Sequence, residues 1–363
     1  MCRSLHLIGQ VPCLRPRLLV HLAAFAILSA LLLSAGCSKH DNPAAPAAAA
    51  ITIYDCACYH EECELLPSPD GSKIAFTSSD GTAFGIWIVS MAGGTPTPAS
   101  FPSPPNLDSV GLVAWLNAGS DLIWSAVISH QSYHQGISFI CNVANNQTTA
   151  LTSPYPNSTM MKVESVSPDG SHLLWSDGNT LWTTKLDGSE PTKLCEAPLI
   201  SNPSWSPDGA TIAWGDADFC LSVIPATGGT VTQITPASIG EVDPYFEWAP
   251  TGDRIAAMAS LDGETQSATL YAVPIAGGTP TALASASSVG SPVWSADGKR
   301  IAFGMPGPDQ TWDVWTIASS GGAAVRLNTG ARDDVPVAWV SGGSQLLIGS
   351  YENDRIHVWM LPL

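Results

Sequence analysis

Residues 205–209 have the sequence WSPDG, and close variants return at 67–71 (PSPDG), 166–170 (VSPDG) and 294–298 (WSADG). In such a turn the proline presets φ, the aspartate hydrogen-bonds its own backbone, and the glycine takes the positive φ that side chains disfavour. The residues that follow, ATIAW at 210–214, alternate as in a pleated strand with Ile212 and Trp214 on one face. This stretch therefore predicts a hairpin turn that leads into a half-buried strand.

The same pattern recurs seven times when it is measured from the turn glycine. An apolar residue lies three and five positions after each glycine, as in Ile74 and Phe76 or Leu346 and Ile348. The turn glycines are 71, 119, 170, 209, 252, 298 and 343, at spacings of 39 to 51 residues. Repeats of this length are typical of radial or stacked arrays.

A second turn divides each of the first six units. These turns are Gly93-Gly94, Asn145-Asn146, Asp187-Gly188, Gly228-Gly229, Gly277-Gly278 and Gly321-Gly322, and a short Thr-rich strand follows each one. A unit of four antiparallel strands is a propeller blade, whereas a β-solenoid has shorter coils without two hairpins per repeat. The pattern predicts an all-β, seven-bladed propeller of four-stranded blades. Aromatic residues just before the first turn are expected to pack between neighbouring blades; they are Trp115, Trp205, Trp248, Trp294 and Trp339.

The seventh unit lacks a fourth strand, because the chain stops at Leu363 just after RIHVWMLPL. An unassigned alternating stretch, AITIYD at 50–55, precedes the first blade. Pairing of the two ends would leave no open edge between the first and last blades. We therefore expect residues 50–55 to pair with the last blade near residues 355–361.

The repeat frame, seen as NPSWSPDGATIAW at 202–214 and SPVWSADGKRIAF at 291–303, resembles that of TolB-type propellers, a WD-like bacterial family. The resemblance covers roughly residues 51–363 and implies the propeller fold. Such propellers serve as docking platforms, peptidase gates and occasionally lyases, so the resemblance specifies function poorly. The α/β domain that precedes the propeller in TolB has no counterpart here, and TolB's role in an envelope complex therefore does not carry over.

Residues 1–36 have the features of a targeting segment. Three arginines precede LLVHLAAFAILSALLL at 18–33, a 16-residue apolar run that is short for a membrane span and suits a signal peptide. The following SAGC resembles a bacterial lipoprotein box in which Cys37 becomes the lipidated first residue, with Ser34 in place of the more usual leucine. The alternative is an ordinary signal peptide with an incidental cysteine. Ser38 after the cysteine implies the outer membrane if the cell has two.

Residues 37–50 form a Pro/Ala-rich tether that is too biased in composition to pack a core.

The formal net charge is −17, and removal of the first 36 residues, which hold three arginines and no acid, makes it −20. A chain this acidic lacks the basic face that nucleic-acid binding requires. We expect contact with the membrane only through the lipid anchor, and a monomer in the cell envelope.

Six cysteines remain after the signal segment and Cys37 are set aside. Cys56, Cys58 and Cys63 lie together in CACYHEEC, where His60 adds an imidazole, and either a local disulfide or a zinc site fits this cluster. The other three, Cys141, Cys195 and Cys220, lie in strand patterns and are expected to be isolated thiols.

Catalytic signatures are absent: we find no G-x-S-x-G, phosphate loop, H-E-x-x-H or dinucleotide fingerprint. His130 and His134 in HQSYH are the one pair with ligand-like spacing, and they are expected in a loop between two strands of the second blade. A pair of this kind is either a weak metal site or simply solvated.

The opposite end of the ring from the SPDG turns is expected to be rich in carboxylates. Its loops contain Asp80, Asp177, Asp216, Asp218, Glu241, Asp243, Asp262, Glu264, Asp309, Asp333, Asp334, Glu352 and Asp354, against the clear bases Arg332 and Arg355. Such a rim attracts cations and basic partners, although a solvated acidic surface is the simpler interpretation. Asp243 and Asp333 are the strongest candidates for binding, because each lies close before a proline that begins an inner strand. Asp334, Glu241, Asp216 and Asp218 complete the candidate set.

The sequence thus favours a lipid-anchored, non-catalytic propeller that binds an envelope protein or peptide, with no cofactor other than a divalent cation such as calcium. The alternative is a propeller enzyme, a metal-assisted polysaccharide lyase or hydrolase with its site at the channel mouth. A lyase for acidic sugars needs basic residues to bind its substrate, which this rim lacks.

Overall fold

The computed structural model describes residues 50–51, 64–79, 84–99, 107–155, 158–260, 267–328, 332–352 and 355–363. The chain divides into two units, Met1–Ala47 and Ala48–Leu363, and only the second contains described residues. Within the described residues no helix has the length and apolar character needed to cross a membrane.

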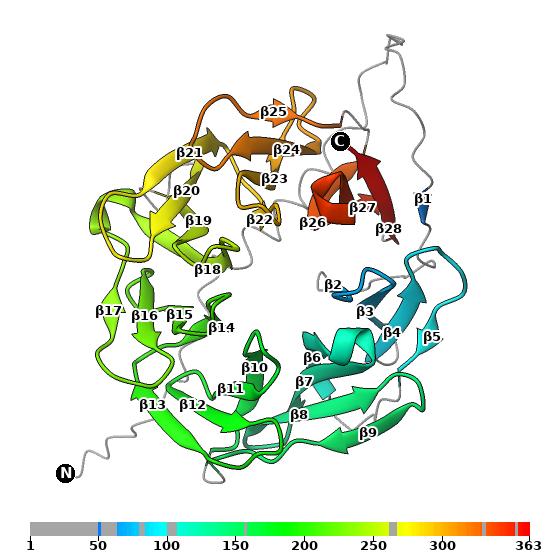
Figure 1. The fold of residues 1–363 in the computed structure, drawn as a ribbon, viewed down its shortest axis with the longest axis vertical. Coiled ribbons are helices and arrows are strands. Elements are labelled where there is room, and N and C mark those ends of the chain that lie inside the picture. The colour runs from blue at the N-terminus through cyan, green and yellow to red at the C-terminus, as the bar shows by residue number, and fades with distance from the viewer. Residues whose placement is uncertain are drawn as a thin grey trace, which may run out of the picture. The chain divides into compact units, whose positions relative to one another are not determined.

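The strands form seven four-stranded antiparallel sheets arranged in a ring, which confirms the predicted seven-bladed propeller (Figure 1). Blade 1 contains β2 (Leu65–Pro67), β3 (Lys73–Ser79), β4 (Phe84–Ser90) and β5 (Thr97–Pro98). Blade 2 contains β6 (Leu107–Leu116), β7 (Asp121–Ser129), β8 (His134–Asn142) and β9 (Gln147–Ala150). Blade 3 contains β10 (Lys162–Val166), β11 (His172–Ser176), β12 (Thr180–Lys185) and β13 (Thr192–Glu196). Blades 4 and 5 contain β14 (Ser201–Trp205), β15 (Thr211–Gly215), β16 (Leu221–Pro225) and β17 (Thr232–Gln233); and β18 (Glu241–Trp248), β19 (Arg254–Ser260), β20 (Ala268–Pro274) and β21 (Thr281–Ala286).

Blade 6 contains β22 (Val293–Trp294), β23 (Arg300–Pro306), β24 (Trp312–Ala318) and β25 (Val325–Arg326). Blade 7 contains β26 (Asp333–Val340), β27 (Gln345–Glu352) and β28 (Arg355–Pro362), with β1 (Ala50–Ile51) as its fourth strand. Three short 3-10 turns are η1 (Asn117–Gly119), η2 (Ala237–Ile239) and η3 (Ser341–Gly343). The first strand of every blade lies nearest the centre of the ring (Figure 1).

The WSPDG stretch forms the predicted turn. Gly209 has φ of 71°, Ser206 Oγ donates to Asp208 Oδ1 at 2.6 Å, and Ala210 N donates to the same oxygen at 3.0 Å. The other six turn glycines also have positive φ. In the first and third blades the corresponding serine hydrogen bonds lower the pKa of Asp70 and of Asp169 to about 2. These carboxylates stabilise their turns only while ionised, so the contribution disappears as the pH falls toward about 2.

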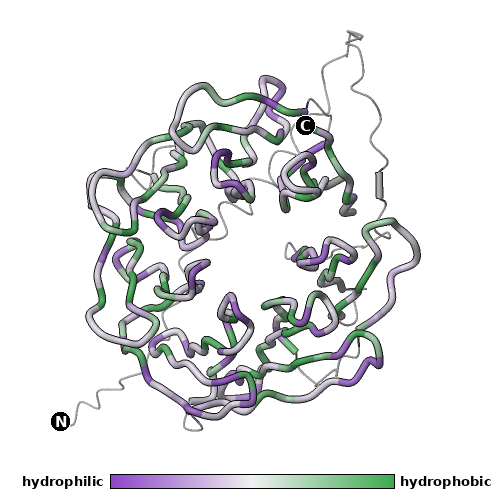
Figure 2. Tube along the Cα trace, viewed as in Figure 1, coloured by the Kyte–Doolittle hydropathy of each residue, from purple (hydrophilic) through white to green (hydrophobic). Residues whose placement is uncertain are grey.

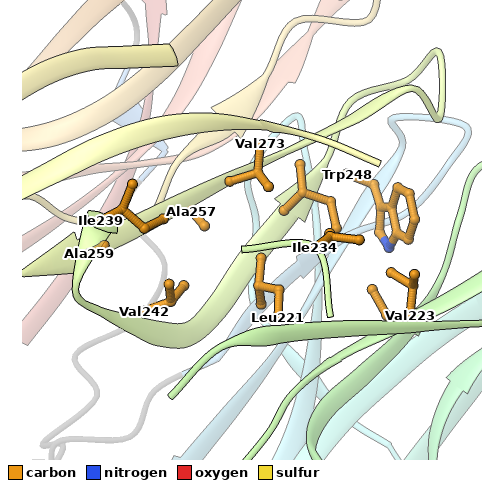
Figure 3. Close-up of a cluster of buried hydrophobic side chains, with 11 residues drawn as sticks. Leu221, Val223, Ile234, Ile239, Val242, Trp248, Ala257, Ala259 and Val273 are labelled. Atoms are coloured by element: carbon orange, nitrogen blue, oxygen red, sulfur yellow. The ribbon is translucent and has the colours of Figure 1, made fainter. Parts of the chain in front are cut away.

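The hydrophobic core lies between neighbouring blades. The apolar residues three and five positions after each turn glycine are buried in every blade, from Ile74 in blade 1 to Ile348 in blade 7. Figure 3 shows the cluster between blades 4 and 5, in which Leu221 and Val223 of β16 meet Val242 and Trp248 of β18. Hydrophobic residues follow the strands and hydrophilic ones gather at the turns (Figure 2).

Tryptophans four residues before the turn glycine join four blades to the preceding blade, in line with the predicted packing between blades. Each of four indole Nε1 groups donates to the innermost strand of the preceding blade: Trp115 to Leu66 O at 2.9 Å, Trp248 to Ser204 Oγ at 3.2 Å, Trp294 to Glu247 O at 3.1 Å and Trp339 to Val293 O at 2.9 Å. The fifth, Trp205, is partly buried and its Nε1 has no hydrogen-bond partner in the described part of the chain.

The ring closes as expected. Ala50 pairs with Trp359 and Ile51 with Val358 in antiparallel register, so β1 supplies the outer strand that blade 7 lacks. Residues 52–55 of the expected segment lie outside the described residues. Closure by both ends of the chain removes the edge that β28 would otherwise expose.

Deletion of residues 50–55 should lower the melting temperature by roughly 5 °C or more, because the closing strand and its hydrogen bonds are lost. Differential scanning calorimetry of the variant measures this shift. Deletion of residues 44–49 is the matched control, since it removes the same length of tether and leaves β1 intact. Equal melting temperatures for the two deletions would contradict closure by β1.

Candidate functional site

Two ends of the ring are distinguished by their connections. We call the strands of a blade a to d from the centre outward. The turns between a and b, and between c and d, form the turn face. The connections between b and c, and from d to the next blade, form the loop face.

Of the predicted loop-face acids, the side chains of Asp177, Asp216, Asp218, Glu241, Asp243, Asp309, Asp333 and Asp334 are described. Asp80, Asp262, Glu264, Asp354 and the side chain of Glu352 lie outside the described residues.

The innermost strands of five blades have a bulge or irregularity in their pairing with strand b. Their register shifts between Leu112 and Ala114, Val163 and Ser165, Ser201 and Ser204, Val242 and Phe246, and Pro336 and Ala338. A bulge bends its strand and re-aims the extra side chains. The irregularity of blade 5 is the longest of the five; it contains Asp243, Pro244 and Tyr245, and Tyr245 is 54% exposed.

Asp243 is held within this bulge. Its Oδ1 accepts a hydrogen bond from Tyr245 N at 2.8 Å. The neighbouring Pro244 packs so closely on Gly215 of β15 that a Cβ added to Gly215 would lie 3.0 Å from Pro244 Cβ. Glu241, at the start of the same strand, is exposed. The structure therefore places two predicted carboxylates on a fixed part of the backbone, with Asp243 half-buried and Glu241 in solvent.

Asp216 caps the loop-face turn of blade 4. Its Oδ1 accepts from Asp218 N at 3.0 Å and from Cys220 N at 3.1 Å, and its Oδ2 accepts from Ser222 Oγ at 2.7 Å. Both oxygens thus serve the turn, whereas the Asp218 side chain is exposed. The turn also holds Phe219 at φ of 54° with its side chain 47% exposed.

Asp333 and Asp334 begin the innermost strand of blade 7 but have different surroundings. Asp333 Oδ1 accepts from Trp312 N at 2.9 Å, which links blade 7 to blade 6. Asp334 is 3% exposed and accepts hydrogen bonds from Asn328 Nδ2 at 2.5 Å and from Ser350 Oγ. Asp334 is therefore not part of the exposed rim in which the sequence placed it.

A buried polar network surrounds Asp334. Trp359 Nε1 donates to Ser350 Oγ at 2.6 Å, so the network reaches the residue that pairs with Ala50 of the closing strand. Desolvation, together with the nearby Asp313 carboxylate, raises the pKa of Asp334. Asp313 is itself completely buried and pairs with Arg326. The role of Asp334 in this arrangement is to join blades 6 and 7.

Asp334→Ala should lower the free energy of unfolding by about 2–3 kcal/mol, because Asn328 and Ser350 then lose their buried acceptor. Chemical denaturation followed by tryptophan fluorescence measures the change. Asp218→Ala, an exposed carboxylate on the same face, is the control and should change stability by no more than about 0.5 kcal/mol. Similar small effects for both variants would show that the network does not stabilise the ring.

His134 lies in a cluster that the sequence did not reveal. Its Nδ1 is 2.9 Å from Asp108 Oδ2 and 2.9 Å from Ser129 Oγ, and Ser129 Oγ also donates to Asp108. A serine relay requires the hydroxyl and the carboxylate on different ring nitrogens, so this arrangement does not activate Ser129. The His134 side chain is 60% exposed.

His130 has separate partners. Its Nε2 lies 3.2 Å from Gln135 Oε1, and its ring stacks on Tyr133 at 4.4 Å between centroids. In the described parts of the chain, no three or more His, Cys, Asp or Glu side chains gather as metal ligands. The donors around His130 and His134 therefore do not fit a metal centre.

The described cysteines are free thiols, with Cys141 and Cys220 buried and Cys195 half-buried. Burial raises the pKa of the Cys195 and Cys220 thiols. The cluster of Cys56, Cys58 and Cys63 lies outside the described residues, and so does Cys37.

Comparison with known proteins identifies the fold but no family. No family model matches the chain, and no curated protein matches it. Among solved structures, an oligogalacturonate lyase in complex with manganese has a TM-score of 0.61 at 12% identity, over 82% of this chain and 88% of that chain. A TolB from Acinetobacter baumannii has a TM-score of 0.49 at 15% identity, over 82% of this chain and 65% of that chain. A protein described as a putative TolB from Agrobacterium tumefaciens has a TM-score of 0.46 at 22% identity, over 62% and 84%. At 12% identity the likeness to the lyase structure establishes the propeller fold alone.

Proposed function

We propose that this chain is a non-catalytic propeller of the bacterial envelope that binds a protein or peptide on its loop face. The observation that carries the proposal is a stretch whose charged side chains are all acidic; Asp208 and Asp253 of this stretch lie at the turn face, and Asp216, Asp218, Glu241 and Asp243 lie at the loop face. From residue 194 to residue 253 the sequence contains eight acids and no lysine, arginine or histidine. This span covers blade 4, whose strands run from β14 to β17, and the innermost strand of blade 5.

The carboxylates of this region are presented by rigid elements. Asp243 is fixed by the bulge of β18, Asp216 caps its turn, and Asp218 and Glu241 are exposed beside them. Asp333 extends the set to blade 7. Convergent negative charge speeds the arrival of basic partners and contributes to specificity, and salt weakens both effects.

The Asp243→Asn, Asp333→Asn double variant should weaken binding of a partner isolated from solubilised envelope by roughly 3-fold to 10-fold, because two rim charges are removed while both side chains keep an acceptor. Surface plasmon resonance at several salt concentrations measures the affinity, which should also fall as salt rises. Glu190→Gln removes an exposed charge on the turn face and should leave the affinity unchanged. Binding that is insensitive to salt and to the double variant would leave the acids as a solvated surface.

We propose further that Cys37 carries the lipid that attaches the propeller to the membrane, on the outer membrane where the cell has two. The support is the LLLSAGC sequence and the tether that follows it. Cys37→Ser should abolish metabolic labelling with a fatty acid and move the protein to the soluble fraction. A variant that stays unlabelled but remains tightly bound to membranes would contradict the anchor.

The enzyme alternative has one observation in its favour, the orientation of His134 by Asp108. A metal-assisted site would need further ligands, and a substrate of acidic sugars would be repelled by the acids of blades 4 and 5. Isothermal titration of the protein with Mn²⁺ or Ca²⁺ separates the two functions. We expect that His134→Ala does not remove any saturable binding of these ions. Saturable binding that is lost in His134→Ala would favour the enzyme.

A further inference from the structure

Among the described residues, the exposed aromatic side chains lie on the loop face or on an innermost strand. Seven large hydrophobic side chains of the described residues are exposed: Tyr133, Leu199, Phe219, Val231, Tyr245, Val325 and Leu363. The three aromatic ones, Tyr133, Phe219 and Tyr245, all belong to the loop face or to the innermost strand that begins there. Val231 and Val325 lie at the other end, next to the turns between strands c and d.

Phe219 and Tyr245 come from segments that are held together. Val242 N donates to Phe219 O at 2.7 Å, which fastens the turn of blade 4 to the beginning of β18. Tyr245 follows Val242 by three residues, at most about 10 Å of extended backbone. Below the two segments, Leu221 and Val242 are packed in the buried cluster of Figure 3. The backbone segments that carry the two aromatic residues are therefore fixed to the same packed core.

Phe219 is exposed and has a backbone conformation that bulky residues rarely adopt. Its φ of 54° is strained for a side chain with a Cβ and would be unstrained for glycine. The Asp216 cap and the Phe219–Val242 hydrogen bond hold this conformation. The chain thus has an exposed aromatic residue where glycine or asparagine would be the ordinary choice.

The charge beside this aromatic pair defines the chemistry of a ligand. Asp218 and Glu241 are exposed next to Phe219 and Val242 in the sequence, and no base occurs from residue 194 to residue 253. A guanidinium group stacks on aromatic rings and forms paired hydrogen bonds with carboxylates, which an ammonium group does less well. An acidic oligosaccharide would be repelled.

We propose that Phe219 and Tyr245, with Asp218 and Glu241, form a docking site for arginine side chains on an extended peptide segment of the partner protein. This inference rests on the proposed binding function and specifies its partner chemistry. The aromatic rings supply stacking surface, the carboxylates supply hydrogen-bond acceptors, and the bulge of β18 together with the blade 4 turn fixes the distance between them.

The test is titration of the full-length protein, purified in detergent, with a capped peptide of alternating glycine and arginine. The Phe219→Ala, Tyr245→Ala double variant should weaken binding at least about 10-fold, as the loss of two desolvated cation–π contacts implies. The matching glycine–lysine peptide should bind several-fold more weakly than the arginine peptide. Val231→Ala, an exposed apolar residue at the other end, should have no effect, and thermal melting of each variant verifies that it folds.

Three outcomes would overturn the inference. The arginine peptide could bind unchanged to the aromatic double variant while the Asp243→Asn, Asp333→Asn variant weakens it, in which case the acidic rim binds without the aromatic pair and the proposed function stands. A neutral oligosaccharide such as maltohexaose could bind in its place and be lost in Tyr245→Ala, which would make this a carbohydrate site. Absence of binding by either probe also overturns the site, and the proposed function is then judged on the envelope partner alone.

Discussion

A hydrogen bond from a tryptophan indole to the innermost strand of the preceding blade joins the blades at four of the seven junctions of the ring. The donor lies four residues before its own turn glycine, and the acceptor lies five residues before the turn glycine of the previous blade, in all four cases. This constant offset fixes how far each innermost strand is shifted against the next. The bond therefore sets the contact between neighbouring innermost strands at these four junctions.

Most of the fold could be predicted because its signals are local and repeated. The turn glycines need positive φ, and the positions three and five residues later are buried in every blade. The closing strand was predictable from a missing element, and Ala50 does pair with Trp359. Each of these features requires only the chemistry of a turn, the two-residue period of a strand and the need to cover an edge.

The candidate site was less predictable, because it depends on which side of a strand a residue faces. Asp333 and Asp334 are adjacent in an alternating strand, so one of them had to face inward, and the sequence does not say which. Asp334 is the buried one, held by Asn328 from the connection after β25 and by Ser350 of β27. Tyr245 is exposed like Glu241 and Glu247 of the same strand, and the sequence does not mark that side of the strand as the open one. The contact of His134 with Asp108 joins residues 26 positions apart, and no local pattern encodes it.

The proposed binding surface is one sector of the loop face, in blades 4 and 5, which lies on a packed core and has no base from residue 194 to residue 253. A photocrosslinking amino acid incorporated at position 219 in living cells tests this proposal most directly, with position 231, which is similarly exposed, as the control at the other end. The account predicts a covalent adduct with a partner protein from position 219 and none from position 231. Adducts from position 231 alone would place the binding surface on the turn face and contradict it.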